Sequence, residues 1–529
     1  MIASKNSIFL PILDINQHVC TNTHALAGLM RIPCGSFADF RMCVIPKVES
    51  LLWPLEVKDC CKTKSIQKFL CTFVPKLATM AERNTVDMTQ GPLLGKILRF
   101  ALPFAASGIM QQLFVTIDVA VVGRFATSEA LAAVGANTFL INLLINLFVG
   151  VSIGSNAVIS NFIGRNDRHR VRDAVGTTMM LPIFASILLL GFGEIFAPSL
   201  LRLMGTPAAI LDQATLFLRV YFLGIPFFMV FTFGQAVLRG KGDTQRPLNI
   251  LLLAGCVNVV LNLLLVIVLH MGVAGVATAT GCANVFSALS ILRLLRREKG
   301  PFRLTRLRLR IDRVALRQIL FIGVPAGVQS MVFSLSNIFV QSAINGYGPS
   351  AIAGAAISLN FDTYCYFLLT SFCGAAVTFT GQNYGAGKID RCRRVFWICM
   401  GCGALACFLA NMLFYTQSDF FLWFFTTDPS VIHYAKVRMA TVLVFQALAS
   451  SYEISAASMR GLGHSIEPTL LTILGTCVLR FAWVFFVCPV WPGFRELMLC
   501  YPISWILTGV MVCVSYVFVS RKAYRKLSL

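Results

Sequence analysis

Long apolar runs separated by short polar joints cover the chain from residue 97 onward. Every run exceeds the roughly 20 residues that an α-helix needs to cross a hydrocarbon core of about 30 Å. We count twelve such runs, over residues 97–123, 131–160, 174–197, 211–238, 247–270, 272–295, 315–343, 351–381, 392–416, 432–459, 467–490 and 494–520. The alternation of short segments that a membrane β-barrel requires is not present in the sequence. The pattern therefore predicts an all-α integral membrane protein with twelve transmembrane helices.

A basic stretch over residues 293–317 divides the runs six and six, with ten Lys or Arg against two acidic residues. We predict an N-terminal six-helix lobe over residues 88–295, a basic cytoplasmic linker over 296–313 and a C-terminal lobe over 314–529. The linker is expected to lie against anionic headgroups, and a regulatory lipid site is the alternative. Residues 1–87 hold no run long enough to span. We expect them to be an extension outside the fold preceding a natural start at Met88, or else a small cytosolic tail.

The basic residues favour one side of the membrane. Joints after the even-numbered runs are rich in Lys and Arg, whereas residues 270–272 and 346–350 contain neither. Cytoplasmic loops carry an excess of Lys and Arg. The bias predicts a multi-pass protein of the cell (inner) membrane with both termini in the cytoplasm.

Composition excludes several functional classes. The formal net charge of +22 would suggest nucleic acid in a soluble protein, but 57% of the residues are hydrophobic and the charges lie between apolar runs. Eighteen cysteines and six scattered histidines are best interpreted without a metal site or a disulfide framework. We therefore expect no nucleic acid partner, no metal and no cofactor, and a monomer in the lipid bilayer.

The two halves repeat each other. Arg239 and Gly240 correspond to Arg460 and Gly461 at an offset of 221 residues, and Gly164 corresponds to Gly385 at the same offset. Because each half has six spans, the halves should share one orientation. Transporters with such parallel repeats bind substrate between the halves and rock one against the other.

A glycine-rich segment, TGQNYGAGK over residues 380–388, follows the eighth run. It is not a nucleotide-binding P-loop, since Ile389 follows the lysine where Ser or Thr is required. This segment, with the Arg-Gly-x-Gly turns at 239 and 460, the turns at 205–207 and 427–429 and the acid at 118, resembles the multidrug and toxic compound extrusion (MATE) family. The resemblance spans nearly all of residues 88–529. The motif residues are Gly381, Gln382, Asn383, Gly385, Arg239, Gly240, Arg460 and Gly461.

Asp118 is the single charge within residues 100–123. A carboxylate at membrane depth costs at least about 2.5 kcal/mol, so it is usually turned inward. Counting residues from the helix ends places Asp118, Asn262 and Thr280 at a similar depth, with Asn258 one turn deeper. The resemblance matches Asp118 to the family's first-helix acid, while Asn262 stands where many members have a second Asp. We predict a cation- or proton-coupling cluster. Hydrogen bonding that merely pins the helices together is the alternative.

The second lobe has its own polar residues within the apolar runs. We predict that Asp362, which has no adjacent cation in sequence, attracts a cationic substrate. Glu453 and Arg480 are further candidates for substrate binding, and by reach they could instead form a structural ion pair. Tyr366 is an aromatic candidate that could stack on a flat ligand or pack in the core.

The resemblance implies a secondary antiporter, not an enzyme, that exports organic, often cationic, drugs or metabolites by alternating access in exchange for H⁺ or Na⁺. One carboxylate among neutral oxygens favours H⁺. A lipid-linked saccharide flippase of related architecture is the alternative and should line its cavity with several arginines. A receptor or scaffold without transport would need an extramembrane domain that we do not find in the sequence.

Overall fold

The computed structural model describes residues 86–125, 128–203, 208–305 and 309–528. The expectation that residues 1–87 lie outside the fold falls almost entirely outside the described residues. The helices belong to one unit, Asn84–Leu529. The described residues contain twelve helices long and apolar enough to cross a membrane, which confirms the all-α, twelve-span prediction. Most spans run a few residues beyond the predicted ends. The predicted run 351–381, for example, is the helix Pro349–Gly385.

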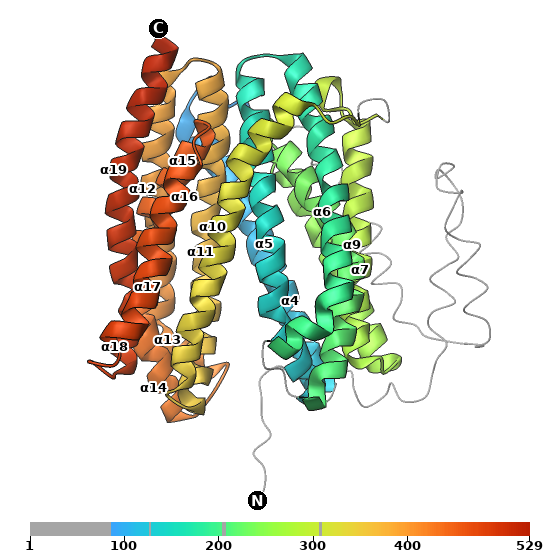
Figure 1. The fold of residues 1–529 in the computed structure, drawn as a ribbon, viewed down its shortest axis with the longest axis vertical. Helices are drawn as coiled ribbons and strands as arrows, with labels where there is room; N and C mark the ends of the chain where they lie inside the picture. The colour runs from blue at the N-terminus through green and yellow to red at the C-terminus, as the bar shows by residue number, and fades with distance from the viewer. Residues whose placement is uncertain (1–85, 126–127, 204–207, 306–308, 529) are drawn as a thin grey trace, which may run out of the picture. The chain divides into compact units, whose positions relative to one another are not determined.

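The first lobe is built from six spans, shown from blue to yellow-green in Figure 1. They are α4 (Leu93–Phe125), α5 (Ser128–Gly164), α6 (Arg168–Leu203), α7 (Ala208–Lys241), α8 (Gln245–Asn262) with its π-helical extension η2 (Leu263–Val268), and α9 (Gly272–Arg297). Pro103 and Pro226 lie inside these helices. Membrane helices tolerate such prolines because neighbouring helices, polar side chains or local helix adjustments can satisfy the freed backbone groups.

The second lobe follows a 3-10 turn, η3 (Gly300–Phe302). Its helices are α10 (Arg313–Asn345), α11 (Pro349–Gly385), α12 (Ile389–Thr416), α13 (Ser418–Trp423), α14 (Pro429–Arg438), α15 (Ser450–Gly461), α16 (Ile466–Thr472), α17 (Leu479–Ala482), α18 (Phe494–Met498) and α19 (Cys500–Ser528). The tenth span is broken between α14 and α15 by η5 (Met439–Leu443) and η6 (Gln446–Ala449). The eleventh span contains η7 (Ile473–Val478) and η8 (Trp483–Val487) on either side of α17.

The two lobes meet mainly through α5, which packs against α10 and α11 (Figure 1). The approach is close enough to require glycine, since a Cβ atom on Gly150 would lie 2.2 Å from the Cα atom of Gly327. Small residues at such crossings let membrane helices pack by van der Waals contact where no hydrophobic driving force exists. Hydrogen bonds add to the contact: Asn156 donates to the Thr378 hydroxyl at 3.0 Å, and Asn146 to the Ser334 hydroxyl at 3.0 Å.

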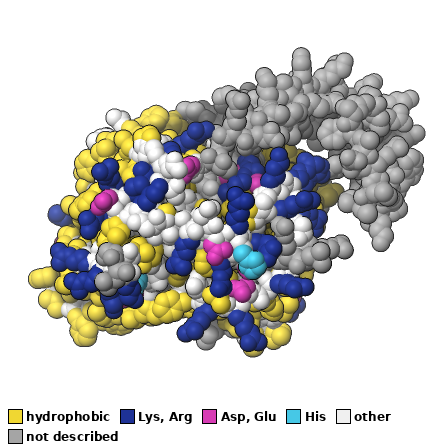
Figure 2. Space-filling view, turned by 90° about the horizontal axis from the view of Figure 1, so that it is seen from above, with side chains coloured by type: hydrophobic (Ala, Val, Ile, Leu, Met, Phe, Trp, Pro, Cys, Tyr) yellow, Lys and Arg dark blue, Asp and Glu magenta, His cyan; other side chains and the backbone are white. Residues whose placement is uncertain are grey.

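One end of the bundle carries the basic joints, and we call it the basic end. It comprises the connections α5 to α6, α7 to α8, α9 to α10, α11 to α12 and α15 to α16, together with the end of α19. Figure 2 looks onto this end and shows Lys and Arg side chains spread over it, with few acidic ones. The opposite end holds the remaining joints, including residues 346–348 between α10 and α11.

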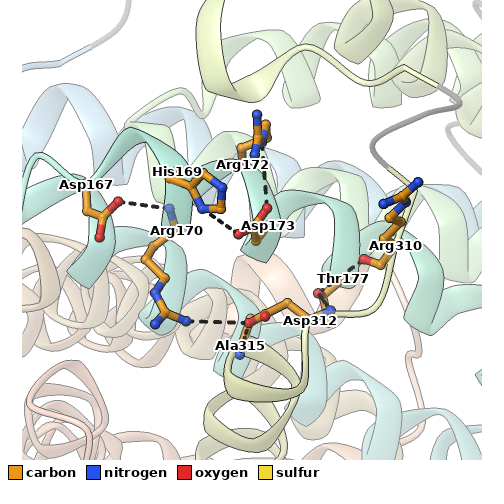
Figure 3. A network of polar contacts seen from close by, with 9 residues as sticks. All are labelled: Asp167, His169, Arg170, Arg172, Asp173, Thr177, Arg310, Asp312 and Ala315. Carbon is orange, nitrogen blue, oxygen red and sulfur yellow. Dashed lines mark hydrogen bonds and ion pairs between the residues drawn. The ribbon is translucent and has the colours of Figure 1, made fainter.

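The connection between the lobes is tied to the first lobe (Figure 3). The Asp312 backbone N–H donates to the Thr177 hydroxyl on α6 at 2.9 Å, and the Asp312 carboxylate caps α10 by accepting from the Ala315 N–H at 2.8 Å. Near its start, Glu298 forms ion pairs with Lys241, at 2.6 Å, and with Arg246. Burial would raise the pKa of the Glu298 carboxyl, but these two cations hold that pKa below its ordinary value. The two acidic residues of the basic linker, Glu298 and Asp312, therefore attach it to the first lobe.

Residues 86–91, which we call the leading segment, lie at the basic end between the lobes. The Val86 N–H donates to the Gly242 carbonyl of the first lobe at 3.4 Å. From the second lobe, Asn383 and Arg391 each donate to the Met88 carbonyl at 3.1 Å, and Lys388 donates to the Thr89 carbonyl at 2.9 Å. Met88 itself is fully buried. The segment thus joins both lobes through its backbone.

Candidate transport site

Four of the predicted polar residues meet in the first lobe. The Asn262 side chain at the end of α8 donates to Asp118 Oδ1 on α4. The Thr280 hydroxyl on α9 donates to Asp118 Oδ2 at 3.2 Å, and Asn258 donates to that hydroxyl at 3.4 Å. Sequence depth alone had placed these residues near one level. The structure brings them into one cluster shared by three helices, which we call the Asp118 cluster.

The Asp118 cluster is rich in acceptors. Among the described residues, no Lys or Arg forms an ion pair with Asp118. The Oδ1 atoms of Asn258 and Asn262 are buried and have no hydrogen-bond partner. A carboxylate beside free amide oxygens can receive a proton, after which its O–H becomes a donor, or it can contribute oxygen ligands to a small hard cation. The arrangement therefore suits a monovalent cation and offers an anion no positive charge.

Helix irregularities accompany the polar residues of the spans. The π-helical stretch η2 begins directly after Asn262, η5 begins directly after Arg438, and α17, which holds Arg480, is enclosed by η7 and η8. Short π-helical segments occur frequently at functional sites, because the wider turn re-aims side chains and frees backbone groups. Sequence periodicity does not reveal them.

The structure places a cation beside Asp362 that its sequence neighbours do not indicate. Asp362 on α11 forms an ion pair with Arg438 on α14, 2.6 Å between Oδ2 and Nη1, and both side chains are over nine-tenths buried. Arg438 also donates to the Ser358 hydroxyl at 3.1 Å, and Gln446 donates to the Asp362 carbonyl at 2.9 Å. Arg438 therefore compensates the charge of Asp362, while Asp362 Oδ1 is buried without a hydrogen-bond partner, and binding of a cationic substrate by Asp362 stays a prediction. The missed signal was Arg438 itself, a basic residue inside the tenth apolar run.

Glu453 and Arg480 do not form the ion pair considered from the sequence. Glu453 on α15 accepts a hydrogen bond from the Tyr366 hydroxyl at 3.2 Å. Arg480 is fully buried and donates to the Ser504 hydroxyl at 3.3 Å and to Asn337 at 3.1 Å. Its guanidinium lies 4.3 Å from the Tyr501 ring centroid, and such stacking stabilises a cation away from water. Tyr366 therefore serves as a hydrogen-bond donor inside the lobe.

The motif residues lie at the joint between the lobes at the basic end. A Cβ atom on Gly385 would lie 2.1 Å from the Asn161 carbonyl oxygen of α5, so only glycine fits. Gln382 donates to the Gly240 carbonyl of the other lobe at 2.8 Å. In the second lobe, Gly461 approaches the Val377 carbonyl and Arg460 donates to Gln329 at 2.8 Å. The remaining motif residues pack in the same region, with Arg239 lying 3.9 Å over the Phe104 ring and Gly381 facing Ser160. Gly240, Gly381, Gln382 and Gly385 thus form contacts across the lobe joint, whereas Arg239, Arg460 and Gly461 pack within their own lobes.

Two parallel six-span lobes, packed by glycines at one end and with a polar cluster within one lobe, define a membrane transporter of the parallel-repeat class. Among the described residues, no group of three or more His, Cys, Asp or Glu could hold a metal ion.

Comparisons with known proteins place the chain more closely. The MatE family model matches residues 103–264 and again 325–486, one match in each lobe. A Bacillus subtilis (strain 168) protein described as a probable multidrug resistance protein, YoeA, is 28% identical over 381 residues, which cover 71% of this chain and 82% of that protein. A probable multidrug resistance protein NorM of Thermotoga maritima is 23% identical over 406 residues, covering 75% and 86% respectively.

A solved structure, the outward-facing conformation of a multidrug resistance MATE family transporter of the MOP superfamily, superposes with a TM-score of 0.76 at 20% identity. The superposed region covers 84% of this chain and 98% of the solved chain. The chain belongs to the MATE family of multidrug efflux transporters, which are transporters of small molecules and not enzymes. The resemblance seen in the sequence is thereby confirmed, as is the two-lobed fold, and the flippase alternative is not favoured.

Proposed function

We propose that this protein is an antiporter that exports organic cations in exchange for H⁺. The alternative coupling ion is Na⁺. The observation that carries the proposal is the Asp118 cluster, in which a carboxylate inside the span α4 forms no ion pair with a described residue and is surrounded by neutral hydrogen-bonding groups. Desolvation favours the protonated form of such a group and so favours H⁺. Na⁺ would have one charged ligand and several neutral oxygens.

Competition for one negative charge would couple the two fluxes. Protonation removes the cost of a charge at membrane depth and lets α4 repack, whereas a cationic substrate benefits from the charged form. The lobe joint at the basic end would then open and close as the balance shifts. The test is uptake of ethidium by proteoliposomes under an imposed pH gradient or, separately, an imposed Na⁺ gradient. Transport that responds only to the Na⁺ gradient would refute H⁺ coupling.

We further propose that the basic end faces the cytoplasm, so that the termini lie there, in keeping with the excess of Lys and Arg on cytoplasmic loops. In a cysteine-free background, Pro349→Cys at the opposite end should react with an impermeant thiol reagent in intact cells. Lys299→Cys, an exposed position at the basic end, is the matched control and should react only after the membrane is opened. The reverse result would invert the proposed orientation.

The leading segment should stabilise the arrangement in which the lobes are closed at the basic end. Arg391 donates to the carbonyls of Met88, Gln90 and Gly91 and to Asn383 Oδ1. Arg391→Ala removes the three bonds to the leading segment, each worth about 0.5–1.5 kcal/mol, so the population open at this end should rise at least about tenfold. The readout is the rate at which a membrane-permeant thiol reagent labels Ser160→Cys, a fully buried position at the lobe joint.

The matched control for this measurement is Arg394→Ala, which removes an exposed charge from the same helix, α12. It should leave the labelling rate of Ser160→Cys near that of the parent. Equal acceleration by both variants would mean that net charge, and not the leading segment, sets the lobe equilibrium.

A further inference from the structure

A cavity of about 580 Å³ lies at the basic end, between the start of α12 and the end of α19, away from the Asp118 cluster. Its lining consists of Ile389, Arg393, Arg521, Lys522, Tyr524 and Arg525. Four of these six side chains are cationic and none is acidic. The acid nearest in sequence, Asp390, lies 3.6 Å from Arg393 with both side chains largely exposed, so it compensates little of the charge. The cavity therefore offers the positive charges of Arg393, Arg521 and Lys522 to an anion.

One lining residue of the cavity, Tyr524, belongs to a buried cluster. Tyr524 is 7% exposed and belongs to a small buried cluster with Cys392, Leu462 and Ala523. The Arg393 guanidinium lies 5.6 Å from the centroid of the Tyr524 ring. Tyr524 thus links the cavity to a buried cluster and lies beside one of the cations. A ligand that combines a charged group with apolar parts fits this wall better than a free ion does.

The exposed face of α19 carries apolar side chains next to the cavity. Val510, Val514 and Phe518 are 59%, 51% and 66% exposed. Residues three or four positions apart share one helix face, so these three side chains lie in line with Arg521 and Arg525. The apolar stripe formed by Val510, Val514 and Phe518 therefore ends at the cationic cavity. This is the order in which a phospholipid presents its acyl chains and its phosphate.

We propose that this cavity binds the phosphate of an anionic glycerophospholipid from the leaflet at the basic end, with the acyl chains along the stripe formed by Val510, Val514 and Phe518. Basic pockets between transmembrane helices bind anionic headgroups in this way. The stripe favours a lipid over a soluble phosphate compound, which would use the cations and leave the apolar face unused. The site is independent of the coupling ion and of the exported substrate.

The test is native mass spectrometry of the purified full-length protein with an equal mixture of phosphatidylglycerol and phosphatidylcholine bearing the same chains. The wild type should retain phosphatidylglycerol in preference. Arg521→Gln with Lys522→Gln should reduce that retention about tenfold or more, since each basic residue near the surface contributes to attraction of anionic lipid. Arg521→Lys, which keeps the charge, should retain most of the binding and separates loss of the site from loss of the fold.

The matched control is Arg296→Gln with Arg297→Gln, which removes the same charge from exposed positions at the end of α9. This control should change retention by less than about twofold. If both double variants lost phosphatidylglycerol equally, the lipid would be held only by the overall positive charge of the basic end, and the proposal would be overturned. Displacement of the lipid by millimolar glycerol 3-phosphate would assign the cavity to a soluble phosphate ligand instead, and equal retention of both lipids would exclude headgroup recognition.

Discussion

Asp118→Asn is expected to reduce gradient-driven ethidium uptake in proteoliposomes to the level of protein-free vesicles. The amide cannot release a proton in the physiological range, so the variant would have no titratable group at the cluster. Its size and one acceptor oxygen are retained, so Asn262 or Thr280 can still donate to that oxygen, while an NH₂ group replaces the second acceptor. The fold should therefore persist, and equilibrium binding of the dye should be weakened rather than lost.

The matched control for Asp118→Asn is Asp212→Asn, the same chemical change at an exposed position on α7 of the same lobe. It should transport at nearly the wild-type rate. Wild-type uptake by Asp118→Asn under an imposed pH gradient would show that Asp118 is not the coupling residue. The Asp118 cluster would then be a set of structural hydrogen bonds, of the kind that join membrane helices at about 0.6 kcal/mol each.

The second large effect is expected at the buried ion pair of the second lobe. Asp362→Asn leaves the Arg438 guanidinium buried without a countercharge, since both side chains are almost entirely enclosed. Removing one partner of such a pair costs about 3–5 kcal/mol. The variant should unfold at a markedly lower temperature in detergent, and its transport of cationic and neutral compounds should fall together.

The double variant Asp362→Asn with Arg438→Gln discriminates structure from substrate binding. It removes both charges at once and should recover part of the lost thermal stability, because no unpaired charge remains buried. A stable Asp362→Asn protein that fails only with cationic compounds would instead restore Asp362 as a substrate-binding residue.

Counting residues from the helix ends predicted the polar contacts of the first lobe better than those of the second lobe. Asp118, Asn262 and Thr280 could be placed at one level by counting residues from the helix ends, because the rise per residue of an α-helix is constant. Their meeting also requires that the three helices face one another, which counting does not determine. In the second lobe the same counting allowed Glu453 to reach Arg480. In the structure, Glu453 instead accepts a hydrogen bond from Tyr366, and Arg480 donates hydrogen bonds to Asn337 and Ser504.

Irregular helices explain part of the difference. The tenth span was predicted as one continuous helix over 432–459, but it changes geometry at Met439 and again at Gln446. Each π-helical turn shifts the facing of the residues that follow, so a helical wheel drawn from the sequence fails beyond the break. Arg438 lies directly before the first such break, and its pairing with Asp362 could not be read from the sequence spacing.

The sequence by itself determined the all-α class, the twelve spans and their division into two six-helix halves, because a bilayer requires a minimum length of apolar residues and satisfied backbone hydrogen bonds. The resemblance to the family came separately, from the segment 380–388 and the Arg-Gly-x-Gly turns. The sequence also identified the glycines of the motif, although not that Gly385 allows contact between α11 and α5 across the lobe joint. Only the tertiary structure decided which polar side chains inside the spans are paired. Inside a membrane the pairing depends on helix rotation and local winding, and apolar composition constrains neither of them.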